Sequence, residues 1–431
     1  MAISLPLFPL ATPGQRYSCH GCGNCCRDFT VQLRGRDVER LNRQQWTTKL
    51  GADPIVEFRG VRYLRQRADG ACVFLRDDGK CEVHAQYGFD EKPLACRMFP
   101  YMLAPEVART RMGVSFACQS VLENKGALCA SQGAEAARIA KDAPETRAAS
   151  TRAALARGLP AMDGELEVLE RALVAWLASE NPIEIRLEGF AWLADSLLVA
   201  KLDAVRAERF EELVGLLVGA LPDELGHRPV APAAPRQLRM LRSAIFARVE
   251  DPRPLAEDSP SRVRATLGQF LRHGAWKRGG ESARVPAIGR ATESMPTFGE
   301  VGTVGGLRAS AERDEIGELI ARWTRASLEG GRVWGSGYYG WDAIAGVGAL
   351  ALNVSCALWL ARLHAARREA GARVHSLTDT RAPTLAGVRW AISRIDRAAG
   401  RAPWLGAWSE RARLAYLAHD SGLRRLTRAS L

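Results

Sequence analysis

The pattern of hydrophobic and polar positions divides the chain into two parts. Residues 55–84 alternate apolar and polar side chains between turn signals, which predicts a small antiparallel sheet or two hairpins. From about residue 131, Ala, Leu, Glu and Arg dominate, and apolar residues recur three and four positions apart, as in amphipathic helices. The predicted fold class is α+β, with a module of short strands in residues 1–130 and a mostly α-helical domain in residues 131–431.

The second part is expected to form several helices and one irregular segment. The predicted helices span Leu166–Leu177, Arg186–Val205, Ala207–Leu221, Ala311–Leu328, residues 384–398 and residues 408–427. The segment Lys277–Arg308 is rich in Gly, Ser, Thr and Pro and poor in large apolar residues. It predicts an irregular, exposed excursion near residues 277–310.

Shorter patterns predict the local structure of the first part. Phe29–Leu33 alternates like a short strand, and Arg36–Leu41 begins a helix with an acidic residue near its start. Lys92–Pro100 is bracketed by prolines and predicts a loop. Met112–Ala117 predicts a strand that leads into Cys118.

One stretch is about the length of a membrane span. Ala343–Ala361 has nineteen residues and no charge, but it is rich in Ala and Gly and is closed by Arg362. This composition favours a buried core helix over a membrane helix. Residues 1–14 lack the basic start and the cleavage pattern of a signal peptide. We therefore expect a cytoplasmic protein without a membrane partner, in a compartment where thiols stay reduced.

The net charge of +12 does not identify a partner. The arginines are spread along the chain, with no basic run of five or more residues. Such spacing is typical of a solvated surface and gives no clear nucleic-acid signature.

Cysteine placement carries the strongest chemical signal. Eight of the ten cysteines lie within the first 118 residues, and four of them follow the spacing C-x2-C-x2-C-C. These eight predicted metal ligands are Cys19, Cys22, Cys25, Cys26, Cys72, Cys81, Cys96 and Cys118. Clustered thiolates in a reducing compartment bind zinc or hold iron–sulfur clusters. Gly21, Gly23 and Asn24 allow the tight turns that bring the sulfurs together.

The adjacent cysteines suggest how the ligands divide. Neighbouring side chains diverge, so Cys25 and Cys26 do not easily bind one ion, which predicts two centres or one polynuclear centre. Our specific hypothesis joins Cys19, Cys22 and Cys25 with Cys96, and Cys26, Cys72 and Cys81 with Cys118.

The remaining cysteines and the neighbouring polar residues have open or secondary roles. Cys129 is a spare ligand or a buried residue, and Cys356 is expected in the core. His20 and His84 lie beside ligands and could replace a thiol. Arg97 follows Cys96 and could offset thiolate charge.

These motifs carry a family resemblance over residues 17–120. The runs CHGCGNCC, GACVFLRDDGKCEVH and KPLACRMFP, followed by Cys118, resemble the YkgJ-type CxxCxxCC family, which is described as zinc- or iron-chelating. Two departures are His84 where Tyr is usual, and Lys92-Pro93 after an insertion where Arg-Pro is usual. Neither removes a thiol.

The resemblance leaves three functions open. The family includes the flagellin lysine N-methylase, which has a long helical region, and that activity would imply S-adenosylmethionine and a protein substrate. A redox or metal-handling protein with an iron–sulfur or zinc centre is the second reading. A structural zinc module whose helical region binds a protein partner is the third. No catalytic residue is identified by any pattern in the chain.

Overall fold

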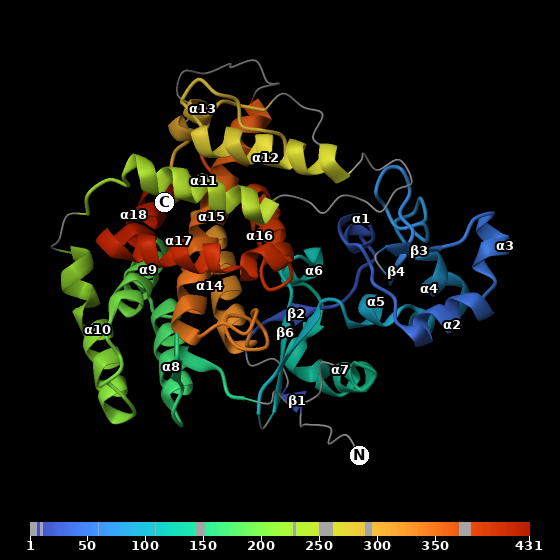
Figure 1. Cartoon of the computed structure of the whole chain (residues 1–431), viewed down its shortest axis with the longest axis horizontal. Coiled ribbons are helices and arrows are strands. Elements are labelled where there is room, and N and C mark those ends of the chain that lie inside the picture. Colours follow the sequence, from blue (N-terminus) through green and yellow to red (C-terminus); the bar gives the residue numbers. More distant parts are fainter. Residues whose placement is uncertain are drawn as a thin grey trace.

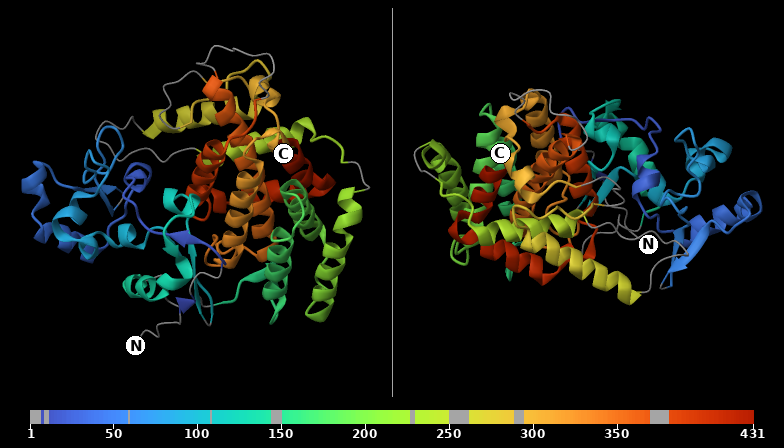
Figure 2. Two further views of the ribbon diagram at one scale, coloured as in Figure 1. Left: turned by 180° about the vertical axis from the view of Figure 1, so that it is seen from behind. Right: turned by 90° about the horizontal axis from the view of Figure 1, so that it is seen from above.

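The computed structural model describes residues 7–8, 12–58, 60–107, 109–143, 151–226, 230–249, 262–288, 295–369 and 381–431. Short strands and short helices make up the N-terminal part, and long helices make up the rest, which confirms the predicted α+β class (Figure 1). The cysteine-rich segment lies at one side of the helical region in both views of Figure 2.

The outer part of the cysteine-rich module combines one hairpin with short helices. Of the sheet or two hairpins expected in residues 55–84, one hairpin forms, β3 (Ile55–Phe58) paired antiparallel with β4 (Val61–Leu64), and the rest of the stretch makes isolated bridges at Cys72 and Cys81. The helices are α1 (Asn24–Asp28), α2 (Gly35–Arg43), α3 (Trp46–Leu50), α4 (Glu82–Tyr87) and α5 (Leu94–Met98). The helix predicted from Arg36 is thus confirmed, and Asp37 closes a capping box at its start.

Two local predictions in this module are wrong. Residues 29–33 form no strand, and only Gln32 makes an isolated bridge, to Tyr63. The segment around Cys96 is helical in α5, not a loop. Pro93 immediately precedes this helix, where its fixed φ and missing N–H cost nothing, so the proline starts a helix here.

A second, inner part of the module carries a small sheet. β5 (Tyr101–Pro105) pairs antiparallel with β6 (Thr110–Val114), and β1 (Leu7–Phe8) pairs parallel with β6. β2 (Arg16–Tyr17) pairs with β7 (Ala127–Leu128), and α6 (Gln119–Leu122) lies between these strands in the sequence. The strand predicted at Met112–Ala117 therefore exists but begins and ends earlier.

Helices build the rest of the chain around α15. Their bounds are α7 (Gly133–Ala140), α8 (Glu165–Leu177), α9 (Ile183–Val199), α10 (Glu208–Gly226), α11 (Pro235–Val249), α12 (Arg262–Arg278), α13 (Phe298–Thr303), α14 (Arg313–Glu329), α15 (Ala343–Glu369), α16 (Leu385–Ala398), α17 (Trp408–Ala418) and α18 (Gly422–Ser430). The short strands β8 (Ala154–Ala156) and β9 (Leu159–Pro160) precede α8. The stretch predicted as one helix at 408–427 is broken in two because Asp420 and Ser421 have positive φ.

The uncharged stretch forms the central helix, as predicted for a core element. Within the described residues, Ala343–Arg367 is a helix long and apolar enough to cross a membrane, and 94% of its most apolar 18-residue window is buried inside the structure. Helices α9, α16 and α18 pack around it. Cys356 lies on this helix and is fully buried, in agreement with its predicted core role.

The segment predicted as an exposed excursion packs against the core instead. Residues 289–294 lie outside the described residues, but Val285, Phe298 and Val301 on either side are buried. The ring of Phe298 contacts Trp276 and Trp359, and Thr297 caps α13. The larger apolar side chains among the described residues of this segment are buried, which composition alone does not reveal.

The hydrophobic cores do not follow the predicted border at residue 130. The outer part of the module has its own small core around Leu41, Trp46 and Phe74. Inner residues such as Met112 and Phe116 belong to the large core of the helices. Residues 101–129 therefore pack as part of the helical body while carrying Cys118.

Candidate metal centre

Two glycines close the cysteine loop tightly against a neighbouring turn. Gly23 begins α1 with a φ of 72°, a left-handed conformation that side chains rarely adopt. A Cβ on Gly23 would lie 2.8 Å from the carbonyl oxygen of Gly79. Gly79 has a φ of 81° and packs back against the carbonyl of Gly21. The C-x2-C-x2-C-C loop can therefore lie flat on the turn that precedes Cys81.

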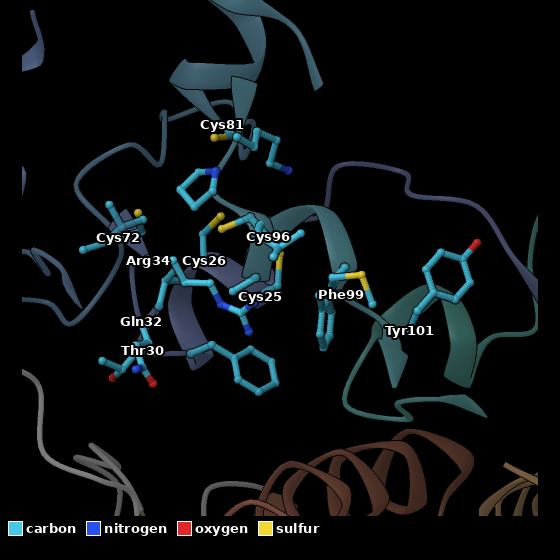
Figure 3. A pocket seen from close by; sticks show the side chains of 18 of the residues that line it. Cys25, Cys26, Thr30, Gln32, Arg34, Cys72, Cys81, Cys96, Phe99 and Tyr101 are labelled. Atoms are coloured by element: carbon cyan, nitrogen blue, oxygen red, sulfur yellow. The ribbon is translucent and has the colours of Figure 1, made fainter. Parts of the chain in front are cut away.

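One group of thiols lines a cavity of about 610 Å³ (Figure 3). Its cysteines are Cys25, Cys26, Cys72, Cys81 and Cys96. The backbone N–H of Cys72 donates to the carbonyl of Cys26 at 2.7 Å, which joins two of the segments. In Figure 3 the side chains of Cys26 and Cys96 point toward one another. Four different segments of the outer module thus bring their thiols to one place.

A second group forms around the first cysteines of the C-x2-C-x2-C-C loop. Cys118 directly precedes α6, and its thiol lies within electrostatic reach of Cys22 and Cys25. Burial raises the pKa of Cys118 to about 12, and those two thiols add to the shift. Burial also raises the pKa of Cys22, with contributions from Cys25 and Cys19. Cys19, Cys22, Cys25 and Cys118 therefore form a set that is more exposed than the first, since Cys19 and Cys22 are open to solvent.

This arrangement agrees with only part of the partition expected from the sequence. Cys96 lines the cavity with Cys25, as expected, but also with Cys26, Cys72 and Cys81. Cys118 is not in the cavity lining and lies within electrostatic reach of Cys22 and Cys25. Helix α5 brings Cys96 to the cavity, whereas Cys118 follows β6 and directly precedes α6.

The adjacent cysteines have opposite acidities. A hydrogen bond between the two side chains lowers the pKa of Cys25 and raises that of Cys26. Lys92 further favours the Cys25 thiolate.

Lys92 supplies the positive charge that the sequence led us to expect from Arg97. Burial disfavours the ammonium of Lys92, but the charges of Cys96, Cys81, Cys25 and Cys26 outweigh it and raise the pKa of Lys92. Arg97 faces away, donating to the carbonyl of Lys92 and to Asp142. The signal for Lys92 is its position four residues before Cys96, just ahead of the helix that carries this cysteine.

The other candidate ligands, His20, His84 and Cys129, do not line the cavity of the first thiol group. His20 and His84 are exposed, and the ring of His84 packs against Phe89. Cys129 is buried against the helical core, with its backbone N–H bonded to the carbonyl of Gln15. Burial raises the pKa of Cys129 to about 11.

The donor set fits zinc or iron in number and in chemistry. The eight thiols, with Cys25 common to both groups, are enough for two tetrathiolate sites of the kind that hold structural zinc and iron–sulfur clusters. In the part of the chain that the structure describes, no three His, Cys, Asp or Glu side chains already stand in a metal-binding arrangement. The thiols are gathered in the right neighbourhoods, and their side chains must turn to converge on a metal.

Comparison with known proteins agrees with this chemistry. Searches of the curated proteins and of the solved structures found no match to the chain. Residues 18–129 match the family model CxxCxxCC, described as "Putative zinc- or iron-chelating domain". The matched segment contains every cysteine of the two groups, and the description concerns chelation and carries nothing on methyl transfer. In residues 18–129 the chain is therefore similar to the CxxCxxCC domain, which is described as chelating zinc or iron.

Proposed function

We propose that this domain holds two thiolate metal centres that share no ligand. The inner centre uses Cys26, Cys72, Cys81 and Cys96, and the outer centre uses Cys19, Cys22, Cys25 and Cys118. The observation that carries the proposal is the position of Cys25: it lines the cavity beside Cys26, and it is also within electrostatic reach of Cys118, which lies outside the cavity lining.

The surroundings of the inner group favour a retained iron–sulfur cluster, with zinc as the alternative metal. Its cavity has apolar walls that include Phe29, Met98 and Phe99. Such walls limit solvent access and so help to set a reduction potential. The ammonium of Lys92 partly offsets the negative charge of four thiolates.

The exposure of the outer thiols suits them to exchange metal with other molecules. Cys19 and Cys22 are exposed, so a small thiol or a partner's ligand can reach a metal held there. A protein with one shielded and one accessible centre can handle metal or electrons in the cytoplasm. This is the redox or metal-handling role, and it requires no methyl donor.

The first test is anaerobic purification followed by absorption spectroscopy and analysis for iron, zinc and acid-labile sulfide. We expect bound metal in the wild type. Iron with sulfide would identify a cluster, whereas zinc without sulfide would leave two zinc centres and remove the redox role. A protein that binds neither metal would refute the proposal.

Matched variants test the division of ligands. Cys96→Ser should remove the inner metal and Cys118→Ser the outer metal, so each variant should keep the metal of the other centre and the double variant should keep none. Cys356→Ala, in the helical core, is the control and should retain both. If either single serine variant loses all of the metal, the thiols form one polynuclear centre and the two-centre proposal fails.

A further inference from the structure

The outer face of helix α12 carries three large apolar side chains that are open to solvent. Leu267, Phe270 and Leu271 are 56%, 71% and 58% exposed. They recur three and four positions apart, so they share one face of the helix, and we call them the apolar stripe. Figure 1 and the view from above in Figure 2 place α12 at an outer edge of the helical region. Apolar side chains that cluster on a surface mark an interaction site, whereas single ones do not.

The other side of α12 is fixed to the helical body. The imidazole of His273 stacks on Phe246 of α11, with ring centroids 5.2 Å apart, and lies 2.8 Å from the Ser243 hydroxyl. Trp276 is buried, and its ring packs against Trp359 of α15. These contacts hold the inner face of α12 in place and direct the apolar stripe away from the body.

The two helices at this edge carry positive charge alone. α11 contains four arginines and α12 contains five Arg or Lys residues, and neither helix contains Asp or Glu. Arg264 and Arg272 make further interactions within the chain. Lys277 and Arg278, in the last turn of α12, are exposed and have no acidic partner among the described residues. The next acidic residue along the chain, Glu281, forms no ion pair with either of them.

Two arginines of α11 extend this charge. A Cβ on Gly279 would lie 2.8 Å from the Nε of Arg242, so Arg242 lies directly beside the end of α12. Burial lowers the pKa of Arg242, and the neighbouring charge of Arg239 lowers it further. The four residues of this basic cluster are Arg239, Arg242, Lys277 and Arg278. The cluster lies at the end of α12 that is farther from residues 250–261, which are outside the described residues.

A convex apolar stripe beside a basic cluster suits a lipid surface better than a protein or a nucleic acid. Apolar faces of peptide helices bind in grooves, whereas the stripe stands out from the edge of the molecule. Leucine side chains offer a nucleic acid neither hydrogen bonds nor an aromatic face. A bilayer interface accepts apolar side chains from one helix, and its anionic lipids attract the cations beside them.

From these observations we propose that α12 docks on the surface of an anionic lipid bilayer, with the apolar stripe among the acyl chains and the basic cluster at the headgroups. This attachment is peripheral, since it uses no spanning helix and leaves α15 buried in the core. It involves none of the thiols and is therefore independent of the proposed metal centres. It replaces the expectation of a protein without a membrane partner.

The test is cosedimentation of the purified full-length, metal-loaded protein with lipid vesicles at low ionic strength. Vesicles of phosphatidylcholine mixed with phosphatidylserine are compared with vesicles of phosphatidylcholine alone. We expect saturable binding to the mixed vesicles, much weaker binding to the neutral ones, and weakening by added sodium chloride through screening.

Matched variants separate the two parts of the surface. The double variant Phe270→Ser with Leu271→Ser should weaken binding roughly tenfold or more, because it removes the apolar area that the bilayer would bury. Lys277→Gln with Arg278→Gln should also weaken binding roughly tenfold or more, through lost attraction to the headgroups. The controls are Leu216→Ser on α10, a residue 73% exposed, and Arg171→Gln on α8, with a side chain 72% exposed, and both should bind like wild type.

A conservative variant guards against misfolding. Phe270→Trp keeps a large aromatic side chain and should bind at least as tightly as wild type, since tryptophan favours the bilayer interface. Circular dichroism and metal content should match wild type in every variant. Absent vesicle binding in the wild type would overturn the proposal, as would equal binding to neutral vesicles or equal binding by all variants. Binding of an acidic peptide or of duplex DNA, without binding to vesicles, would also overturn it.

Discussion

Asp396→Ala tests how the helical body holds the segment that leads to Cys118. Asp396 on α16 is buried, and its two oxygens accept from four groups. Arg332 donates at 2.9 Å and Trp323 at 3.2 Å to one oxygen. The Ser115 hydroxyl, at 2.7 Å, and the Ala117 backbone N–H, at 3.2 Å, donate to the other.

The size of the effect follows from the charge that the substitution leaves behind. Arg332 is also buried, so removal of the carboxylate leaves an uncompensated guanidinium in the core. Breaking a buried pair in this way costs about 3–5 kcal/mol of the free energy of unfolding. Summing the four hydrogen bonds separately would count the same desolvation more than once. We therefore expect a loss within that range.

The assay is denaturant unfolding followed by far-ultraviolet circular dichroism, at pH 7, with metal content measured in parallel. Asp396→Asn is the matched comparison, since it keeps the shape and some of the hydrogen bonds while losing the charge. The double variant Asp396→Leu with Arg332→Met should recover much of the loss, because it leaves no buried charge. A cost of about 1 kcal/mol or less for Asp396→Ala would refute the reasoning, since it would match an ordinary neutral hydrogen bond.

The same residue predicts a pH dependence. Burial raises the pKa of Asp396, but Arg332 and the Ser115 hydroxyl outweigh it, and the net pKa is lowered. The stabilisation is therefore complete above the unfolded pKa of about 4 and is lost as the pH falls through the folded pKa. Asp396→Asn should lose this acid-labile part, so its stability should fall less than that of wild type below about pH 4. Parallel curves for the two proteins would contradict the assignment.

Three further predictions concern single residues. Gly23→Ala, which forces a Cβ to within 2.8 Å of the Gly79 carbonyl oxygen, should lower the metal content of the purified protein, and wild-type content would show that the loop adapts. Burial raises the pKa of Glu165, but hydrogen bonds from Arg206 and from backbone N–H groups outweigh it and lower the pKa to about 2, so its stabilisation is lost as the pH falls from about 4.5 toward 2. The melting temperature of Glu165→Gln should accordingly fall less than that of wild type as the pH is lowered from about 4.5 toward 2. An equal fall in both proteins would argue against the stabilising interaction between Glu165 and Arg206. Thr297→Ala removes the cap of α13 and should cost about 1 kcal/mol in denaturant unfolding, with Thr297→Ser as the neutral control.

The sequence predicted those helices and turns whose conformation depends on residues close by in the chain. Leu166–Leu177 matches α8 within one residue, because its apolar spacing and acidic start act within the helix itself. The turn glycines of the cysteine loop were predicted for the same reason, and their positive φ is confirmed. The eight ligands remain a prediction, although the structure gathers their thiols into two groups.

The sequence did not predict the features that depend on contacts between residues far apart in the chain. The partner of Cys96 depends on how α5 docks beside α1, and no spacing in the chain encodes that docking. Lys92 was missed because three of its partners, Cys25, Cys26 and Cys81, lie far from it in the sequence, whereas Arg97 was chosen only for being next to a cysteine. The segment near 277–310 was misjudged because its few apolar side chains find their contacts on helices far away in sequence.

The shared core has a thermodynamic consequence. Cys118 follows Phe116 and Ala117, which are buried in the helical body, and Arg322 of α14 donates to the carbonyls of Val121 and Leu122 just beyond it. Cys118, a proposed ligand of the outer centre, is therefore part of the helical body, while the other proposed ligands of that centre belong to the cysteine loop. A metal bound there would connect the cysteine loop to the helical body, so the melting temperature of the helices should rise with metal occupancy. An excised fragment ending at residue 130 would expose Phe116 and Val121, so the domain is a poor candidate for a self-standing module.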